Sequence, residues 1–152
     1  MEHMTWDPAF SVADPLIDEQ HQALFRLINR MIDHPQAEYT SEVISELLTE
    51  ATKYAVEHFR TEEEYMERLK YPSLAVHKLE HKKFLIKITN ATMLVMEKKQ
   101  GPTDLLAFLK AWFKHHILFS DMNYRRWNES RFEKPQKTQD ASCCTPSPEE
   151  AA

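Results

Sequence analysis

The chain contains a single glycine among 152 residues, and this scarcity restricts its possible folds more than any other feature. Proteins built from β-hairpins or nucleotide-binding loops need glycine at their turns and phosphate contacts. Four segments of the sequence instead repeat apolar residues at the 3.6-residue period of an amphipathic helix. The sequence therefore predicts an all-α protein.

Four long helices are expected, over residues 16–33, 41–70, 74–100 and from 104 to beyond Tyr124. Residues suited to begin or end these helices stand at their boundaries: Thr40 or Ser41, Ser73 and Thr103 as N-caps, and Pro35 and Gly101–Pro102 as terminators. Short connections between helices that each carry one apolar stripe favour an antiparallel up-down-up-down four-helix bundle.

The two ends of the chain are expected to lie outside the helices. Residues 1–15 form an N-terminal arm, in which Trp6 and Phe10 are suited to pack on the bundle. From residue 133 onward the composition becomes polar and proline-rich, with too little apolar surface to bury. We therefore expect one four-helix-bundle domain over residues 1–132, with its arm over 1–15, and a disordered C-terminal tail over 133–152.

Composition argues against several classes of protein. The formal net charge is -5 and no basic stripe stands out, so a nucleic-acid partner is not expected. No apolar run approaches the ~18 residues of a membrane span, and the start has no signal-peptide pattern. The only cysteines, Cys143 and Cys144, are adjacent and cannot join distant segments. A cytoplasmic monomer is the resulting expectation, and the role of the cysteine pair stays open.

Seven polar residues lie at helical spacing on the apolar faces of the four helices. They are His21, His58, Glu62, His77, His81, His116 and Asp121. Burying each without a partner would cost roughly 1–3 kcal/mol, so something must satisfy them together. A metal centre inside the bundle accounts for the whole set, whereas His3, His34 and His115 lie off these faces.

The spacings agree with shared ligation, with one exception. His58 and Glu62 are four residues apart, as are His77 and His81, so each pair lies on one helix face. Asp121 follows His116 by five residues, which leaves it ~140° away in a regular α-helix. The sequence therefore predicts a π-type turn between His116 and Asp121, since such turns collect at functional sites.

The number and type of ligands indicate the metal. Five imidazoles and two carboxylates exceed the four ligands of tetrahedral zinc and suit two six-coordinate ions with bridging carboxylates. Imidazole with carboxylate favours iron, while manganese and cobalt remain open. The sequence has no Glu-x-x-His pair, which argues against the carboxylate-rich centres of ferritin-like proteins.

In these residues the chain resembles the hemerythrins, most closely the single-domain bacterial kind. The resemblance covers about Trp6 to Trp127. It rests on four segments that contain the ligands in order: Ile17-Asp18-Glu19-Gln20-His21, His58-Phe59-Arg60-Thr61-Glu62-Glu63, Tyr71-Pro72 with His77-Lys78-Leu79-Glu80-His81, and Trp112-Phe113-Lys114-His115-His116-Ile117 with Asp121 and Tyr124.

The resemblance implies a non-haem di-iron centre. His77, His81 and His116 would hold one iron, and His21 and His58 the other. Glu62 and Asp121 would bridge the two iron ions (Fe2+/Fe3+) together with an oxo or hydroxo group. Dioxygen would bind reversibly at the open position of the two-histidine iron.

The residues expected to line the oxygen pocket are Phe25, Phe59, Trp112 and Phe113. Phe113 departs from the family, which commonly has leucine three residues before this histidine, and a larger ring would narrow the pocket or its entry. No serine, cysteine or lysine lies beside His21 and His58 as an obvious catalytic partner, which favours binding over turnover.

The expected function is therefore oxygen storage, delivery or supply to an oxygen-consuming enzyme, without catalysis. Three alternatives remain open: a di-iron oxygen or redox sensor, a di-iron enzyme that acts on peroxide or nitric oxide, and iron storage. Sensors of this type are usually fused to a signalling domain, and none fits here.

Overall fold

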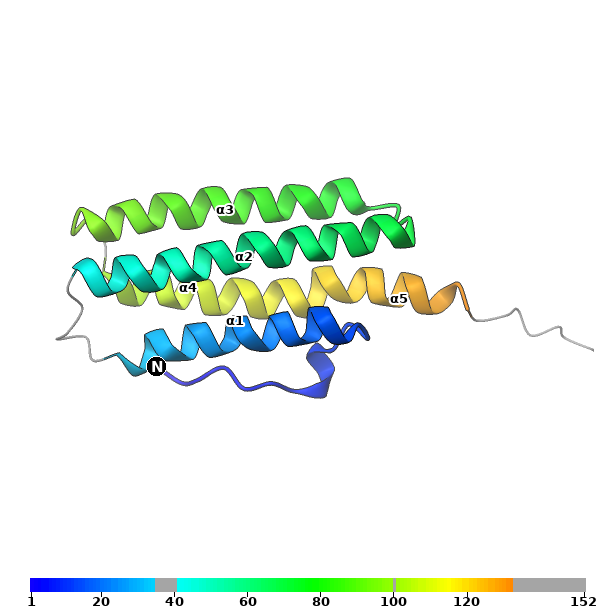
Figure 1. Cartoon of the computed structure of the whole chain (residues 1–152), viewed down its shortest axis with the longest axis horizontal. Helices are drawn as coiled ribbons and strands as arrows, with labels where there is room; N and C mark the ends of the chain where they lie inside the picture. The colour runs from blue at the N-terminus through cyan, green and yellow to red at the C-terminus, as the bar shows by residue number, and fades with distance from the viewer. Residues whose placement is uncertain (35–40, 100, 133–152) are drawn as a thin grey trace, which may run out of the picture.

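The computed structural model describes residues 1–34, 41–99 and 101–132, and the expected tail lies outside them. Long helices run side by side and alternate in direction along the bundle (Figure 1). The first helix contacts the second and fourth, and the third contacts the same two, so the four close around one core. This confirms the predicted antiparallel four-helix bundle.

The helices follow their predicted ranges closely. They are α1 (Pro15–Asp33), α2 (Ser41–Leu69), α3 (Leu74–Met96), α4 (Pro102–His115) and α5 (Met122–Ser130), with a 3₁₀ turn η1 (Pro8–Phe10) in the arm. A π-helical segment, η3 (His116–Asp121), joins α4 to α5, so the fourth rod of the bundle is α4, η3 and α5 in succession. The buried residues of each helix recur on the side that faces its neighbours, and α3 also exposes apolar residues on its outer side, among them Val76, Ile86 and Met93.

Lysines with left-handed backbone angles follow the second and third helices, and Lys70 stands at the end predicted for the second. Lys70 and Lys98 adopt left-handed backbone angles, with φ of 58° and 57°. The next amide of each turns back to a helix carbonyl, with Lys99 donating to Leu94 at 2.8 Å. The expectation that Gly101 ends the third helix was wrong, since this helix stops at Met96 and Gly101 precedes α4. With so few glycines available, lysine takes a conformation that costs about 1–2 kcal/mol.

The predicted helix starts are only partly confirmed. Ser73 precedes α3, yet its side chain makes no capping hydrogen bond, and its backbone carbonyl accepts from Val76 and His77 instead. The prediction that Thr103 caps the fourth helix was wrong, because that helix already begins at Pro102. Proline suits this first position since its ring presets the helical φ and no amide is needed there. The proposed Thr40 cap and the Pro35 terminator lie outside the described residues.

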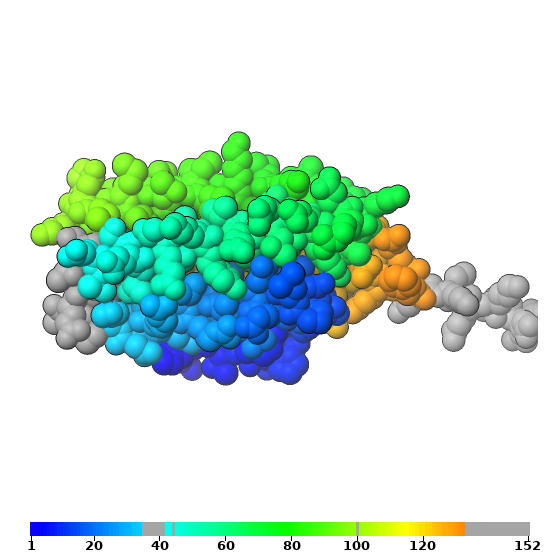
Figure 2. Space-filling view, viewed as in Figure 1, coloured from blue at the N-terminus to red at the C-terminus, as the bar shows by residue number. Residues whose placement is uncertain are grey.

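The N-terminal arm packs along α1, as expected, and Figure 2 shows it covering the lower edge of the bundle. The amide and carbonyl of Met4 both bond to the side chain of Asn29, at 2.7 and 2.8 Å. Farther along, the Asp18 carboxylate accepts from the amide of Val12 at 2.8 Å. Met4, Phe10 and Val12 are buried, so the arm extends the core.

The core has two parts, and the buried polar residues lie between them. A large apolar cluster fills the end of the bundle that includes Leu48, Leu105 and Leu109. A smaller one, built from Val12, Ile17, Met66 and Tyr124, closes the other end. Within the described residues, none of the helices has the length and apolar character needed to cross a membrane.

Candidate metal centre

Every rod of the bundle contributes to one polar cluster in its interior. All seven residues predicted from sequence are there and are 0–4% exposed: His21 on α1, His58 and Glu62 on α2, His77 and His81 on α3, and His116 and Asp121 on η3. Their side chains point inward because each occupies an apolar-stripe position of its helix. The seven side chains thus lie together in the interior, and their role as metal ligands stays a prediction.

The π-helical segment brings Asp121 into this cluster. In η3 the backbone winds more loosely than in an α-helix, so five residues complete about one turn. The Oδ1 atom of Asp121 therefore lies 3.1 Å from Nε2 of His116, on the same inner side. The predicted π-type turn is confirmed.

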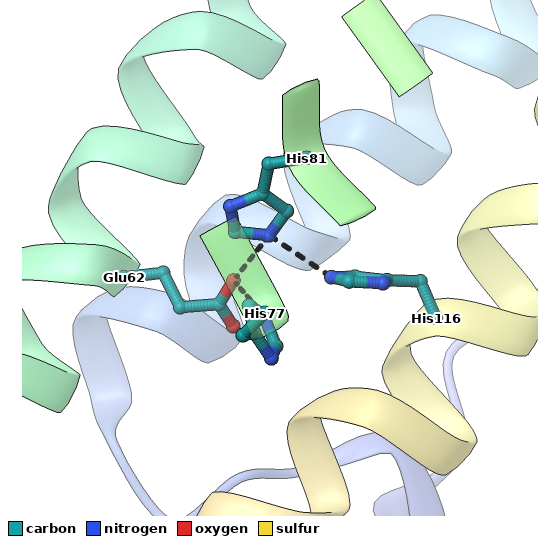
Figure 3. A group of neighbouring side chains, drawn as sticks. All are labelled: Glu62, His77, His81 and His116. Carbon is teal, nitrogen blue, oxygen red and sulfur yellow. Dashed lines mark hydrogen bonds and ion pairs between the residues drawn. The ribbon is translucent and has the colours of Figure 1, made fainter. Parts of the chain in front are cut away.

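The first group of donors comprises Glu62, His77, His81 and His116, which face one another across α2, α3 and η3 (Figure 3). Oε2 of Glu62 lies 3.3 Å from Nε2 of His77 and 3.2 Å from Nε2 of His81. Nε2 of His81 in turn lies 3.0 Å from Nε2 of His116. Three imidazoles and a carboxylate oxygen thus converge on one small volume.

The second group comprises His21, His58 and the same Glu62. Asp121 also reaches both groups: its Oδ2 lies 3.4 Å from Nε2 of His21, and its Oδ1 lies 3.4 Å from Nε2 of His77. Two carboxylates therefore lie between a three-histidine pocket and a two-histidine pocket. This arrangement lets each carboxylate offer one oxygen to either side.

The donor atoms fit bound metal better than hydrogen bonding among themselves. Within the described chain, both ring nitrogens of His21 and both oxygens of Asp121 are buried without a hydrogen-bond partner, despite the close contacts between them. Leaving such buried atoms unsatisfied costs about 1–3 kcal/mol each. A cation in each pocket would satisfy these atoms together, because a metal ion accepts lone pairs from nitrogen and oxygen, whereas two facing lone pairs cannot form a hydrogen bond with each other.

Outer side chains fix the orientation of three of the imidazoles. Nδ1 of His81 lies 2.9 Å from a Glu63 oxygen, and Nδ1 of His116 lies 3.2 Å from a Glu80 oxygen. Nδ1 of His58 faces the amide oxygen of Gln20 at 3.1 Å. When Nδ1 donates its proton outward, Nε2 keeps its lone pair for the interior, which is the state a metal ligand needs.

Burial and neighbouring charges set the protonation of the second pocket and the shared carboxylate. Burial lowers the pKa of His58 well below its ordinary value, and the nearby His21 lowers it further. Burial alone would raise the pKa of Glu62, but in the metal-free protein hydrogen bonds from His77 and His81 outweigh it and hold that pKa well below the usual range. A neutral imidazole and an ionised carboxylate are the forms that bind metal.

The groups around His116 and Tyr124, in the rod that contains η3, also have shifted pKa values. Burial would lower the pKa of His116, but the Asp121 and Glu80 carboxylates outweigh it and raise that pKa. The hydrogen bond with His116 in turn lowers the pKa of Glu80 to about 2. Burial and the Glu62 charge hold the pKa of Tyr124 well above its ordinary value, so its hydroxyl donates to Glu62 at 2.9 Å.

Comparison with known proteins decides the family. The protein-family model described as "Hemerythrin HHE cation binding domain" matches residues 12–127 of this chain. The chain belongs to the hemerythrin family. Bacteriohemerythrin of Clostridium acetobutylicum is 30% identical in an alignment of 124 positions that covers 78% of this chain and 96% of that protein. A hemerythrin-like protein of Naegleria gruberi is 32% identical over 120 residues, which are 79% of this chain and 89% of its own.

Solved structures agree with this assignment. The crystal structure of wild-type hemerythrin matches this bundle with a TM-score of 0.73 and 28% sequence identity, over 81% of this chain and 95% of that one. A leucine-to-alanine variant of hemerythrin matches with a TM-score of 0.75, over 83% and 97%. The resemblance inferred from the ligand motifs is therefore confirmed, and the His/Glu cluster marks a hemerythrin-type metal site.

Aromatic rings cover the three-histidine side of this hemerythrin-type cluster. Phe59 stacks on the ring of His81, with centroids 3.9 Å apart, and Trp112 stacks on His116 at 4.3 Å. Phe113 is buried against Phe84, and Phe25 packs with the arm. All four aromatics adjoin the same apolar cluster. Their role as the lining of an oxygen pocket stays a prediction.

Sequence reasoning missed the side chains that contact Nδ1 of these histidines, which are Gln20, Glu63 and Glu80. Each stands next to a ligand in the sequence, but it contacts a histidine on the following rod of the bundle. Their adjacency to ligands was the available signal. Outside the cluster, His115 is exposed, as predicted, and His3 pairs with Asp33.

Proposed function

We propose that this protein binds dioxygen reversibly at a non-haem di-iron centre. The observation that supports the proposal most is the shared position of Glu62 and Asp121 between the two groups of histidines. A carboxylate common to two pockets is suited to bridge two ions. The family of the chain and the imidazole-rich donor set favour iron for both.

In this proposal His77, His81 and His116 would hold one iron, and His21 and His58 would hold the other. Glu62 and Asp121, which reach both groups of histidines, would be shared between the two ions together with an oxo or hydroxo group from solvent. Two ferrous ions held in this way would supply the two electrons that reversible oxygen binding requires. The pocket with fewer histidines would leave room for the oxygen ligand.

The residues of the chain itself favour binding over turnover. The donors are 0–4% exposed, and the rings of Phe59 and Trp112, which stack on His81 and His116, make one side of the cluster apolar. An interior that excludes water also excludes protons that would drive bound oxygen to irreversible products. The phenol of Tyr124 keeps its proton because its pKa is raised, and it is already committed to Glu62.

Metal content and optical spectroscopy test the proposal. Purified protein is expected to contain about two irons per chain, since the donor set serves two six-coordinate ions. The reduced sample should develop a charge-transfer band in air and lose it when oxygen is removed, over repeated cycles. A colourless protein with one zinc, or a band that never reverses, would overturn the proposal.

Adjacent histidines provide a matched control for this experiment. His116→Ala removes a buried donor, whereas His115→Ala removes an exposed ring one residue earlier. The first variant should lose iron and the oxygen-dependent band, and the second should keep both. Steady consumption of peroxide or nitric oxide by the wild-type protein would instead assign an enzyme.

A further inference from the structure

The two pockets differ in the side chains that contact the outer ring nitrogen, Nδ1, of their histidines. In the three-histidine pocket, Nδ1 of His81 and of His116 each face a carboxylate, from Glu63 and Glu80. In the two-histidine pocket, Nδ1 of His58 faces the neutral amide oxygen of Gln20. Nδ1 of His21 is buried with no partner among the described residues. Anionic partners therefore gather behind one pocket alone.

The orientation of the Gln20 amide is fixed by a second contact. Its Nε2 donates to the hydroxyl oxygen of Thr61 at 3.3 Å, so its carbonyl oxygen is the atom turned to His58. The amide accepts the imidazole proton and adds no charge. The second pocket consequently has oriented but uncharged support, whereas the first has oriented and anionic support.

A carboxylate behind an imidazole makes that imidazole a stronger electron donor to its metal. A stronger donor stabilises the higher charge state of the ion more than the lower one. We propose that Glu80 and Glu63 are positioning residues that bias the three-histidine pocket toward the ferric state, so that a one-electron oxidant removes the first electron there. This inference rests on the proposed di-iron function and deepens it.

Glu80 is expected to have the larger effect of the two. Its Oε2 accepts from the Ser120 hydroxyl at 2.6 Å and lies 3.2 Å from Nδ1 of His116, so the hydroxyl helps to hold the carboxylate against the ring. The π-helical segment that delivers Asp121 also delivers this serine. The Glu63 carboxylate faces His81 with one oxygen and lies 3.8 Å from the ammonium of Lys78 with the other, so the Lys78 charge partly offsets its effect on His81.

Reciprocal variants test the inference in the iron-loaded protein. Glu80→Gln removes the charge behind the three-histidine pocket, and Gln20→Glu adds one behind the other. Ferricyanide, which accepts one electron per molecule, titrates the reduced protein, and Mössbauer and EPR spectra identify the ion oxidised first. Glu80→Gln should weaken the ferric preference of the three-histidine pocket about tenfold, the lower end of the effect of such partners on metal affinity.

That change equals about +59 mV in the first one-electron potential. Gln20→Glu should lower the potential of the other iron by a similar amount and narrow the gap between the two steps. Two controls accompany these variants. Ser120→Ala keeps the charge and should shift the potential less, and Glu64→Gln removes an exposed charge of the same helix that bears Glu63.

The outcomes separate this inference from the proposed function. Failure of the wild-type protein to take up two irons would reject the proposed function itself. With two irons bound, equal potentials in Glu80→Gln, Gln20→Glu and wild type would overturn only the inference. Equal shifts of both steps in Glu80→Gln and Glu64→Gln would overturn it as well, because they would show a general charge effect. If Glu80→Gln loses iron, Ser120→Ala takes its place, and its potential must shift upward while that of Gln20→Glu shifts downward. If Gln20→Glu loses iron, the comparison of Glu80→Gln with Ser120→Ala and Glu64→Gln decides alone.

Discussion

Removal of the Tyr124 hydroxyl isolates the hydrogen bond that supports the shared carboxylate. The ring is fully buried, and its hydroxyl donates to Oε1 of Glu62 at 2.9 Å. Tyr124→Phe keeps the packing of the ring but leaves a buried, ionised oxygen without this donor. Hydrogen bonds to charged groups contribute about 1.5–3 kcal/mol, so we expect a loss of about 2 kcal/mol in the free energy of unfolding.

Urea denaturation followed by helical circular dichroism measures this loss. A chelator is present throughout, because bound metal would add its own free energy to the folded state. For a chain of this size, 2 kcal/mol corresponds to a fall of roughly 4–8 °C in Tm. Tyr65→Phe is the matched control, since Tyr65 is half-buried and its ring packs on Tyr124 at 5.9 Å.

The pH dependence follows from the lowered pKa of Glu62. A carboxyl with a depressed pKa in the folded protein adds stability above its ordinary pKa and loses it as the pH falls toward the depressed value. The difference between Tyr124→Phe and wild type should therefore persist from pH 7 to 5 and shrink only in stronger acid. The reasoning fails if both tyrosine variants match the wild type to within about 0.5 kcal/mol, the range of neutral surface changes.

Three further outcomes are expected. Phe113→Leu replaces a buried ring with a smaller side chain, so oxygen should enter faster or autoxidation should change. Flash photolysis measures the oxygen on-rates and off-rates, and the decay of the oxygenated spectrum measures autoxidation. Identical values of all three in the variant and the wild type would contradict this expectation. Chelation of the iron should lower the Tm measured by calorimetry, and added ferrous iron should restore it. The reason is that a ligand that binds only the folded state stabilises that state by mass action. An unchanged Tm would exclude metal as the partner of the buried cluster. Metal affinity in competition titrations should rise with pH, since the raised pKa of His116 in the metal-free protein lets protons compete below that value; a flat profile from pH 5 to 8 would count against this histidine as a ligand.

Much of the site was visible in the sequence because burial follows helical periodicity. His77 and His81 stand four residues apart on a stripe that continues through Phe84 and Ile88, and all four are buried. The distance from His116 to Asp121 broke that period by one residue, and the break itself predicted η3. Periodicity within one helix therefore sufficed to identify the donors.

Contacts between helices were not visible, because they depend on how far one rod slides along the next. Gln20 meets His58 across 38 positions of sequence, and Glu80 meets His116 from the preceding rod. The periodicity of residues within a single helix does not reveal how far that helix is shifted along its neighbour. Helix ends were also misplaced where Lys98 took the left-handed position that glycine usually takes.

The π-helical segment has a consequence for the whole fourth rod. Upstream of it, Phe113 and His116 face the interior, and downstream of it Asp121 and Tyr124 do. In an uninterrupted α-helix, eight residues from His116 to Tyr124 would leave the tyrosine ~80° out of phase. The extra residue in the π-helical turn removes this phase difference, so Tyr124 faces the interior. The exposed Phe119 lies in this wider turn. The fourth rod thus has two separately phased inner faces, one for each end of the buried polar cluster.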